Sequence, residues 1–353
     1  HLNLKNKIKI LFVFNNLDVV NGISHYCKPI LEYLSSSNDF ELFILCGRFP
    51  EMKLKINNSC LIIDETINYD KRNIYNFIKI FFNFNNLLKK YNIDIVQTHH
   101  FYHSFIFKYL KLIHRIKVFQ TIHGLIPNKG ILPHFSADFY FVVSKHSYEY
   151  LKTKLINIKI IHYYFKRFKA KQNHSNNNIK FLISSRLCKE KGFEVLFDAI
   201  EILKNQKLYF DISIAGNGDM EDFVKSKCKK YKLNFLGQVN DIENIIPKFD
   251  VLINPIIGEN EGVPTILIQA ALNKLLIISS NYFGHEFYLN KNNSLIYNKA
   301  NPRELAENII YVSKNFHKLN KIRKNIFTDF RKEFYNKLNF ESQFTIYKSF
   351  FNE

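Results

Sequence analysis

Apolar runs of four to eight residues alternate with longer amphipathic segments along this chain. Runs rich in β-branched and aromatic residues predict buried strands in both halves, from "KIKILFVF" and "IDIVQT" to "IKFLISS" and "FDVLINP". Helical patterns separate many of the runs, for example at 23–36, 72–91, 193–204 and 264–273. Continuous apolar strands that alternate with helices are typical of parallel sheets covered on both faces. The pattern predicts an α/β chain with two doubly wound, Rossmann-like domains.

A polar, basic and Asn-rich segment divides the two halves. It predicts a linker at 165–178, between an N-terminal domain at 1–164 and a second domain at 179–325. Basic and aromatic residues at 326–353 predict a C-terminal helical segment that packs back on the N-terminal domain. Ligands of open parallel sheets bind beyond the carboxyl ends of the strands. We therefore expect two facing domains with a cleft between these ends.

Composition narrows the class of protein. The 353 residues carry a formal net charge of +19, which favours an anionic partner such as a nucleic acid, acidic lipid or phosphorylated small molecule, unless the Lys content is compositional drift. No stretch reaches the about 18 apolar residues that span a bilayer. The five cysteines form no C-x-x-C pair, which favours reduced thiols over structural zinc. We expect a cytoplasmic protein.

Two cations follow a predicted strand of the second half. In "ISSRLCKEKGFEVLF", Arg186 and Lys191 lie between the strand and a helix. Phosphates bind at such places, because free N–H groups and the helix dipole favour negative charge. Arg offers a fork of donors and Lys a compact charge. Taken alone, the pair is also compatible with two surface cations near a loop.

Glycines mark two further strand ends. "IAGNGDMEDFV" places Gly216 and Gly218 in a strand-to-helix turn, but the third glycine of a dinucleotide fingerprint is missing, so taken alone the pair favours a tight turn. Gly237, in "FLGQVND", could let a planar base approach the backbone.

The stretch "GENEGVPTILIQAAL" carries an acid and an amide around a helix start. Pro264 suits the first turn of the predicted helix, so Glu261 and Gly262 lie beside exposed N–H groups. Gln269 follows Glu261 by eight residues, a spacing that returns to roughly the same helix face. Both side chains can accept hydrogen bonds from sugar hydroxyls. The alternative is an acid that complements the helix dipole and an incidental amide.

These segments occur together and in order. With "SSNYFGHEFYL", they resemble the nucleotide-sugar half of a GT-B glycosyltransferase, and most closely the retaining family 4 with its glycosyltransferase group 1 domain. The resemblance is strong across 179–312 and weaker before that. It implies a retaining hexosyltransferase that uses a nucleoside diphosphate sugar, with no cofactor and no metal ion.

The resemblance also implies roles for individual residues. Arg186 and Lys191 would grip the donor diphosphate, Glu261 would lie near the donor sugar, and His123, in "TIHGLIP", would reach that sugar. Gln269 replaces the second acid of the family's E-x7-E motif, which puts nucleotide affinity or identity in doubt. The expected donor-binding residues are Gly22, Gly216, Asn217, Gly237, Val239, Gly262, Val263, Thr265 and Gln269.

The acceptor is less defined by the sequence. The resemblance suggests a saccharide, free or lipid-linked, in the synthesis of a bacterial surface polysaccharide such as lipopolysaccharide. Apolar residues at 74, 77, 78, 81, 84 and 88 form one helix face, which either packs on the first sheet or touches an anionic membrane. The second reading would place the protein peripherally on the inner face of the plasma membrane. His99, His100 and His103 lack an evident carboxylate partner, so a loop is favoured over a metal site, and no D-x-D motif is present.

Three alternatives stay open at this stage. A nucleotide-sugar epimerase of the same fold would need no acceptor, although its expected carboxylates are not visible. A nucleic-acid-binding protein would suit the charge, but the basic residues are dispersed and no recognition motif is present, so we expect no nucleic-acid partner. A non-catalytic relative would suit the replacement at Gln269.

Overall fold

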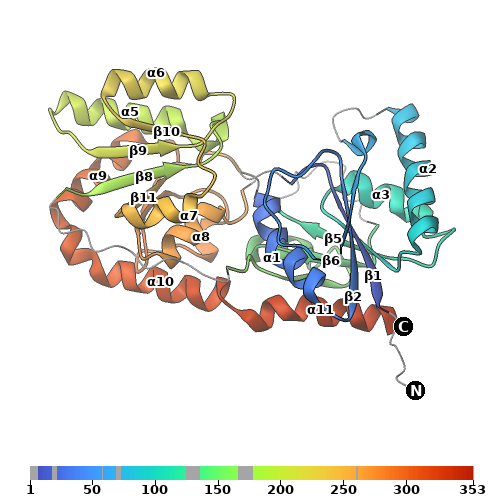
Figure 1. Ribbon diagram of the computed structural model, residues 1–353. Coiled ribbons are helices and arrows are strands. Elements are labelled where there is room, and N and C mark those ends of the chain that lie inside the picture. The colour runs from blue at the N-terminus through green and yellow to red at the C-terminus, as the bar shows by residue number, and fades with distance from the viewer. Residues whose placement is uncertain are drawn as a thin grey trace. The chain divides into compact units, whose positions relative to one another are not determined.

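The computed structural model describes residues 7–17, 22–57, 59–68, 73–124, 136–165, 178–259 and 261–352. The chain divides into two compact units (Figure 1). The first comprises His1–Tyr164 and Lys337–Glu353, and the second comprises Phe165–Asn336. Each unit contains one parallel sheet with helices. The prediction of two doubly wound α/β domains is confirmed.

The first unit has the strand order β3-β2-β1-β4-β5-β6-β7. Its strands are β1 (Ile8–Phe14), β2 (Phe40–Cys46), β3 (Ser59–Ile63), β4 (Ile95–Thr98), β5 (Lys117–Ile122), β6 (Phe139–Val142) and β7 (Ile158–Ile160). Its helices are α1 (Gly22–Ser36), α2 (Ile74–Tyr91), α3 (Phe101–Leu110), α4 (Lys145–Leu151) and α11 (Lys337–Asn352), with a 3-10 turn η1 (Glu65–Ile67). The strand order reverses between β1 and β4, so this is the switch point at which such sheets bind ligands.

The second unit has the strand order β10-β9-β8-β11-β12-β13. Its strands are β8 (Lys180–Ser184), β9 (Asp211–Ala215), β10 (Asn234–Gly237), β11 (Val251–Asn254), β12 (Leu276–Ser280) and β13 (Leu295–Tyr297). Its helices are α5 (Phe193–Asn205), α6 (Glu221–Tyr231), α7 (Ile242–Ile245), α8 (Thr265–Leu272), α9 (Pro302–Asn315) and α10 (Asn320–Phe334). The 3-10 turns are η3 (Lys189–Lys191), η4 (Ile246–Lys248), η5 (His285–Phe287) and η6 (Phe316–Leu319). Here the switch point lies between β8 and β11.

The central strands are buried because helices cover both faces of each sheet. In the first unit, α2 and α3 pack on a cluster that includes Leu11, Val96 and Val118. Capping side chains define several helix ends. Asn301 caps α9 by accepting from the backbone N–H of Glu304, with Pro302 in the first turn, the usual arrangement of these residue types.

The C-terminal helix α11 belongs to the first unit, although it follows the second in sequence. Tyr347 is fully buried there, packs on Phe119 and Phe141, and donates a hydrogen bond to Gln97 Oε1 at 2.7 Å. The second unit extends to Asn336, beyond the boundary expected at residue 325, because α10 packs on α8. Residues 166–177 of the expected linker lie outside the described part of the chain. Among the described helices, none is long and apolar enough to cross a membrane.

Candidate functional site

The switch point of the second sheet joins the loops that follow β8 and β11. The backbone N–H groups of Ile257 and Gly258 both donate to the carbonyl oxygen of Glu190, each at 3.0 Å. These bonds hold the 3-10 turn η3 against the segment that leads to α8. Two stretches that lie 70 residues apart in sequence, one with Lys191 and the other with Glu261, therefore meet at one edge of the sheet.

Lys191 and Glu261 form an ion pair at this edge. The Lys191 Nζ atom lies 2.6 Å from Glu261 Oε1, and Lys191 is only 8% exposed. A buried ammonium group needs a partner, because its desolvation is otherwise costly. An ammonium group has three donors, so one carboxylate bond leaves capacity for another anion. The structure thus brings together two residues that the sequence predicts to act on one ligand.

Gly192 makes this approach possible, and sequence reasoning missed it. Its φ is +73°, in the left-handed region, and a Cβ there would lie 1.8 Å from the carbonyl oxygen of Pro255. Only glycine fits this position without moving the loop after β11. The glycine directly after a candidate phosphate-binding lysine was the available signal.

The loops after β8, β9 and β10 are joined backbone to backbone. Leu187 N–H donates to Asn217 O at 2.7 Å, and Gly216 N–H donates to Gly237 O at 2.7 Å. A Cβ at Gly216 would lie 1.9 Å from the oxygen of Ser185, so this glycine serves the close packing of the turn. A Cβ at Gly237 would meet only the Phe235 ring, at 3.9 Å, so the space above Gly237 is open.

Other predicted residues of the second unit lie around these loops. Arg186 is exposed on the loop after β8, and Val239 is half-buried after β10. The Asn217 side chain donates to Gln238 Oε1 at 2.9 Å. Val263 is buried, and Thr265 begins α8. These residues come from neighbouring strand ends, which is the arrangement expected of a ligand site in such a sheet.

The expectation that Glu261 and Gln269 share a helix face is wrong. Pro264 has ψ of 128° and caps α8, which begins at Thr265, so Glu261 lies in the non-helical segment before the helix. The helical period therefore does not relate the two residues. Gln269 is 5% exposed, and its Nε2 atom has no hydrogen-bond partner among the described residues. Such a buried donor is uncommon and is available to a ligand.

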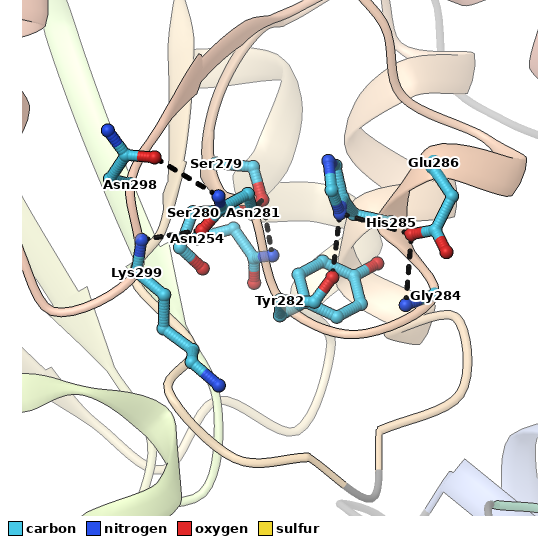
Figure 2. A network of polar contacts seen from close by, with 10 residues as sticks. All are labelled: Asn254, Ser279, Ser280, Asn281, Tyr282, Gly284, His285, Glu286, Asn298 and Lys299. Atoms are coloured by element: carbon cyan, nitrogen blue, oxygen red, sulfur yellow. Dashed lines mark hydrogen bonds and ion pairs between the residues drawn. The ribbon is translucent and has the colours of Figure 1, made fainter.

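The loop after β12 holds a buried tyrosine near Glu261, a second residue that sequence reasoning missed. Burial raises the pKa of Tyr282, and the Glu261 carboxylate raises it further. Figure 2 shows the polar contacts that fix this loop. His285 Nδ1 lies 2.7 Å from Tyr282 O, and Asn281 Nδ2 donates to Asn298 Oδ1 at 3.2 Å. The sequence pattern gave no reason to assign Tyr282 to the site, because a single aromatic residue is usually explained by packing in the core.

In the first unit, two predicted residues lie at the carboxyl edge of the sheet. Gly22 begins α1, and a Cβ there would lie 3.5 Å from the Tyr163 hydroxyl. His123 follows β5, and its Nε2 atom lies 2.9 Å from Nδ1 of His99, which follows β4. Burial lowers the pKa of His123 to about 3, so its imidazole is neutral. Among the described residues, no group of three or more His, Cys, Asp or Glu is placed to hold a metal ion.

Comparisons with known proteins agree with this architecture. The profile described as "Glycosyl transferases group 1" matches residues 165–329, and that described as "Glycosyltransferase Family 4" matches residues 20–163. The amylovoran biosynthesis glycosyltransferase AmsK of Erwinia amylovora is 28% identical over 30% of this chain, a match that spans only 28% of its own length. The capsular polysaccharide biosynthesis glycosyltransferase CapH of Staphylococcus aureus is 23% identical over 78% of this chain and 81% of its own. The crystal structure of Anabaena Alr3699/HepE in complex with UDP has a TM-score of 0.73 at 15% identity, and covers 97% of this chain and 100% of its own.

Proposed function

This chain is a GT-B glycosyltransferase of group 1 and family 4, and from this premise we propose that it moves a sugar from a UDP-sugar to a hydroxyl group of a saccharide acceptor. The acceptor would belong to a bacterial surface polysaccharide, as the printed names of the AmsK and CapH relatives suggest. The UDP bound by the Anabaena protein of the same fold supports uracil as the base. We assign the four residues that the sequence predicts to be catalytic to this reaction: Arg186, Lys191, Glu261 and His123.

The observation that carries the proposal is the ion pair of buried Lys191 with half-buried Glu261 at the switch point of the second sheet. A buried cation with unused donors attracts a diphosphate. Arg186, exposed on the same loop, adds a fork of donors that suits phosphate oxygens. Glu261 lies just before the start of α8, beside N–H groups that favour negative charge. Gln269, on the buried side of α8, offers an amide to the ribose hydroxyls.

The chemistry follows from these charges. The bond between the anomeric carbon and the diphosphate breaks, the acceptor hydroxyl attacks the same face of the sugar, and its proton passes to the departing phosphate. The configuration is then retained. The cationic groups at Arg186 and Lys191 stabilise the leaving diphosphate, a task that metal ions perform in other enzymes, so we propose a reaction without a metal ion or cofactor.

We expect one nucleotide class to stabilise the protein. A ligand that binds only the folded state at 100 times its Kd adds about 2.7 kcal/mol. UDP-sugars should therefore raise the melting temperature, while GDP- and ADP-sugars should have a smaller effect. The measurement is a thermal-shift series at matched concentrations. A chain that responds to no nucleotide sugar would contradict the proposed function.

Helix α2 and residues 109–115 carry exposed apolar side chains that could bring the enzyme to a membrane-bound acceptor. On α2, the side chains of Ile74 (74% exposed), Tyr75, Ile78 and Phe82 face solvent, while Phe84 and Leu88 pack inward. The apolar face predicted at 74–88 is thus divided between core and solvent. Helix α3 contacts α2 (Figure 1), and Leu112 (83% exposed) and Ile113 follow it. The exposed cations around these residues are Lys79, Lys89, Lys90, Lys108 and Arg115.

Exposed apolar side chains that share a segment with exposed cations suit the surface of an anionic bilayer. We propose that this surface, formed by α2 and residues 109–115, binds anionic lipid and brings the enzyme peripherally to a lipid-linked acceptor on the inner face of the plasma membrane. The overall charge of +19 acts in the same direction.

The protein should sediment with phosphatidylglycerol vesicles at low salt and be released at high salt, because screening weakens the attraction of exposed charges. The double variant Ile74→Ser, Ile78→Ser should sediment less. A matched control is Tyr209→Ser, an exposed aromatic residue of the second unit, which should sediment like the original protein. Equal binding to neutral phosphatidylcholine vesicles would show that anionic lipid is not the partner.

A further inference from the structure

The loop after β2 presents an exposed aromatic side chain at the ligand-binding edge of the first sheet. Phe49 is 73% exposed and follows shortly after Cys46, the last residue of β2. Strand β2 pairs in parallel with β1, so both strands end at the same edge, beside the switch point between β1 and β4. Single exposed apolar side chains are common on protein surfaces, so exposure alone does not indicate a site. The backbone beneath Phe49 gives the second indication.

Gly47 holds this loop against two neighbouring loops. Its N–H group donates to the carbonyl oxygens of Phe14 and Asn15, at 3.1 and 3.0 Å, and its carbonyl oxygen accepts from Nδ2 of Asn68 at 3.3 Å. A Cβ at Gly47 would lie 2.7 Å from the carbonyl oxygen of Asn15, so any side chain there would displace the backbone after β1. The Phe49 ring therefore stands on a loop whose backbone is fixed before any ligand binds.

Polar groups accompany the ring in these joined loops. The Asn15 side chain is half-buried, and its Oδ1 atom has no hydrogen-bond partner among the described residues. A buried oxygen of this kind costs free energy unless a ligand or water supplies a donor. Arg48, which is exposed directly before Phe49, adds guanidinium N–H groups. An aromatic face together with an amide and a guanidinium group suits a sugar ring, which has C–H groups on a face and hydroxyl groups around its rim.

We propose that a sugar ring of the acceptor stacks on Phe49 and that Asn15 and Arg48 bind hydroxyl groups of this sugar. The negative face of an aromatic ring attracts C–H groups that carry partial positive charge, and the contact removes apolar area from water. A loop that is already ordered loses little conformational entropy on binding. All three residues belong to the first unit, so this site does not depend on the second. The identity of the ligand as the acceptor rests on the proposed function.

A membrane is the alternative partner for an exposed ring. Membrane binding grows with the apolar area that is buried, and several exposed apolar side chains share α2. The loop after β2 instead offers one ring among the exposed polar residues Arg48, Glu51 and Lys53. An anionic bilayer would repel the glutamate. These observations favour a saccharide over a bilayer at Phe49.

The chain contains no tryptophan, so Phe49→Trp introduces a single fluorescent reporter at this position. Tryptophan keeps an aromatic face, and its emission and its quenching by acrylamide change when the ring is covered. The probes are methyl β-glucoside, methyl β-galactoside and methyl N-acetyl-β-glucosaminide. At least one of them should shift the emission and protect the ring from acrylamide in a saturable titration. The matched control is Tyr75→Trp, an exposed aromatic position on α2 of the same unit, whose emission no saccharide should shift.

Activity supplies a second readout. UDP release is measured from UDP-glucose, UDP-galactose or UDP-N-acetylglucosamine, whichever stabilises the protein most, and the saccharide that shifts the reporter should accelerate it. In Phe49→Ala, the KM for this saccharide should rise about twofold to tenfold, the effect of one aromatic contact, with little change in kcat. Phe49→Tyr keeps the ring and should restore the KM. Ile156→Ala, which changes an exposed apolar residue elsewhere in the first unit, should leave the KM unaltered.

The two proposals can fail separately. If no saccharide changes the Phe49→Trp signal, or if phosphatidylglycerol vesicles change it and saccharides do not, the sugar site is wrong whatever nucleotide the chain binds. If a saccharide covers the reporter but no nucleotide sugar stabilises the chain, the proposed function is wrong and saccharide binding stands. Melting temperatures of the variants, measured alongside, show that each is folded.

Discussion

Lys191→Met should lower kcat by about a hundredfold to a thousandfold. Methionine keeps the apolar stem that is buried beside η3, but it removes the ammonium group that contacts Glu261 at 2.6 Å. Fixed groups directed at developing charge contribute about 3–4 kcal/mol in comparable sites. The charge on the diphosphate grows as the sugar bond breaks, so kcat should fall more than KM rises. Steady-state UDP release gives both constants.

Lys189→Met is the matched control. Lys189 belongs to the same 3-10 turn but is exposed, so its loss should change kcat less than threefold, about 0.7 kcal/mol. If both variants lose activity equally, general attraction of the donor by the basic loop explains the result. If Lys191→Met retains full kcat, the electrostatic role assigned to the ion pair is wrong.

Local pattern was sufficient for most of the fold. "KIKILFVF" became β1, in which six of seven residues are buried, as its pattern BiBBBBB shows. The strands that escaped prediction are β7 (Ile158–Ile160) and β13 (Leu295–Tyr297). Three residues are too short to show a period, and each strand exists because it pairs with a neighbour, β6 or β12. The packing of α11 on the first unit was predicted only from the basic and aromatic composition of this segment. The local sequence pattern of a helix does not indicate which domain the helix packs against.

The site was less accessible to sequence reasoning. The order of motifs along the chain identified Lys191 and Glu261 as candidates. Their contact depends on two N–H groups of the loop after β11, which donate to the carbonyl oxygen of Glu190, and the sequence does not show this. The eight-residue spacing predicted that Glu261 and Gln269 share a helix face. This prediction is wrong because α8 begins only at Thr265, after Pro264. For Gly192 the sequence offered only its position after Lys191, and the structure adds the close approach to Pro255 that requires a glycine. Tyr282 is identified from the structure alone, by its burial and by the nearby Glu261 carboxylate.

The free energy of unfolding should fall steeply as the pH falls below about 6.5, and His103 should account for a measurable share of this loss. His103 is fully buried, and its Nε2 lies 3.0 Å from Ile67 O. Burial lowers its pKa to about 3. Above pH 6.5, neither the folded nor the unfolded imidazole is charged, so the residue adds no pH dependence. Below that value the unfolded chain binds a proton that the folded chain cannot, which lowers the free energy of unfolding by about 1.4 kcal/mol per pH unit.

Between pH 6.5 and 4.5, His103 alone should therefore lower the free energy of unfolding by about 2.3 kcal/mol. Burial also lowers the pKa values of His99 and His123, so these two residues act in the same direction. His103→Gln keeps an amide donor that can reach Ile67 O but cannot be protonated. Its free energy of unfolding, from urea titrations followed by circular dichroism at several pH values, should fall less steeply than that of the original protein. Carboxylates titrate equally in both proteins and cancel in the difference. The control His317→Gln changes an exposed imidazole and should leave the slope unaltered. The prediction is wrong if the free energy of unfolding falls with pH at the same rate in His103→Gln and in the original protein. The folded chain would then bind a proton at His103 as readily as the unfolded chain does, and such a group adds no pH dependence.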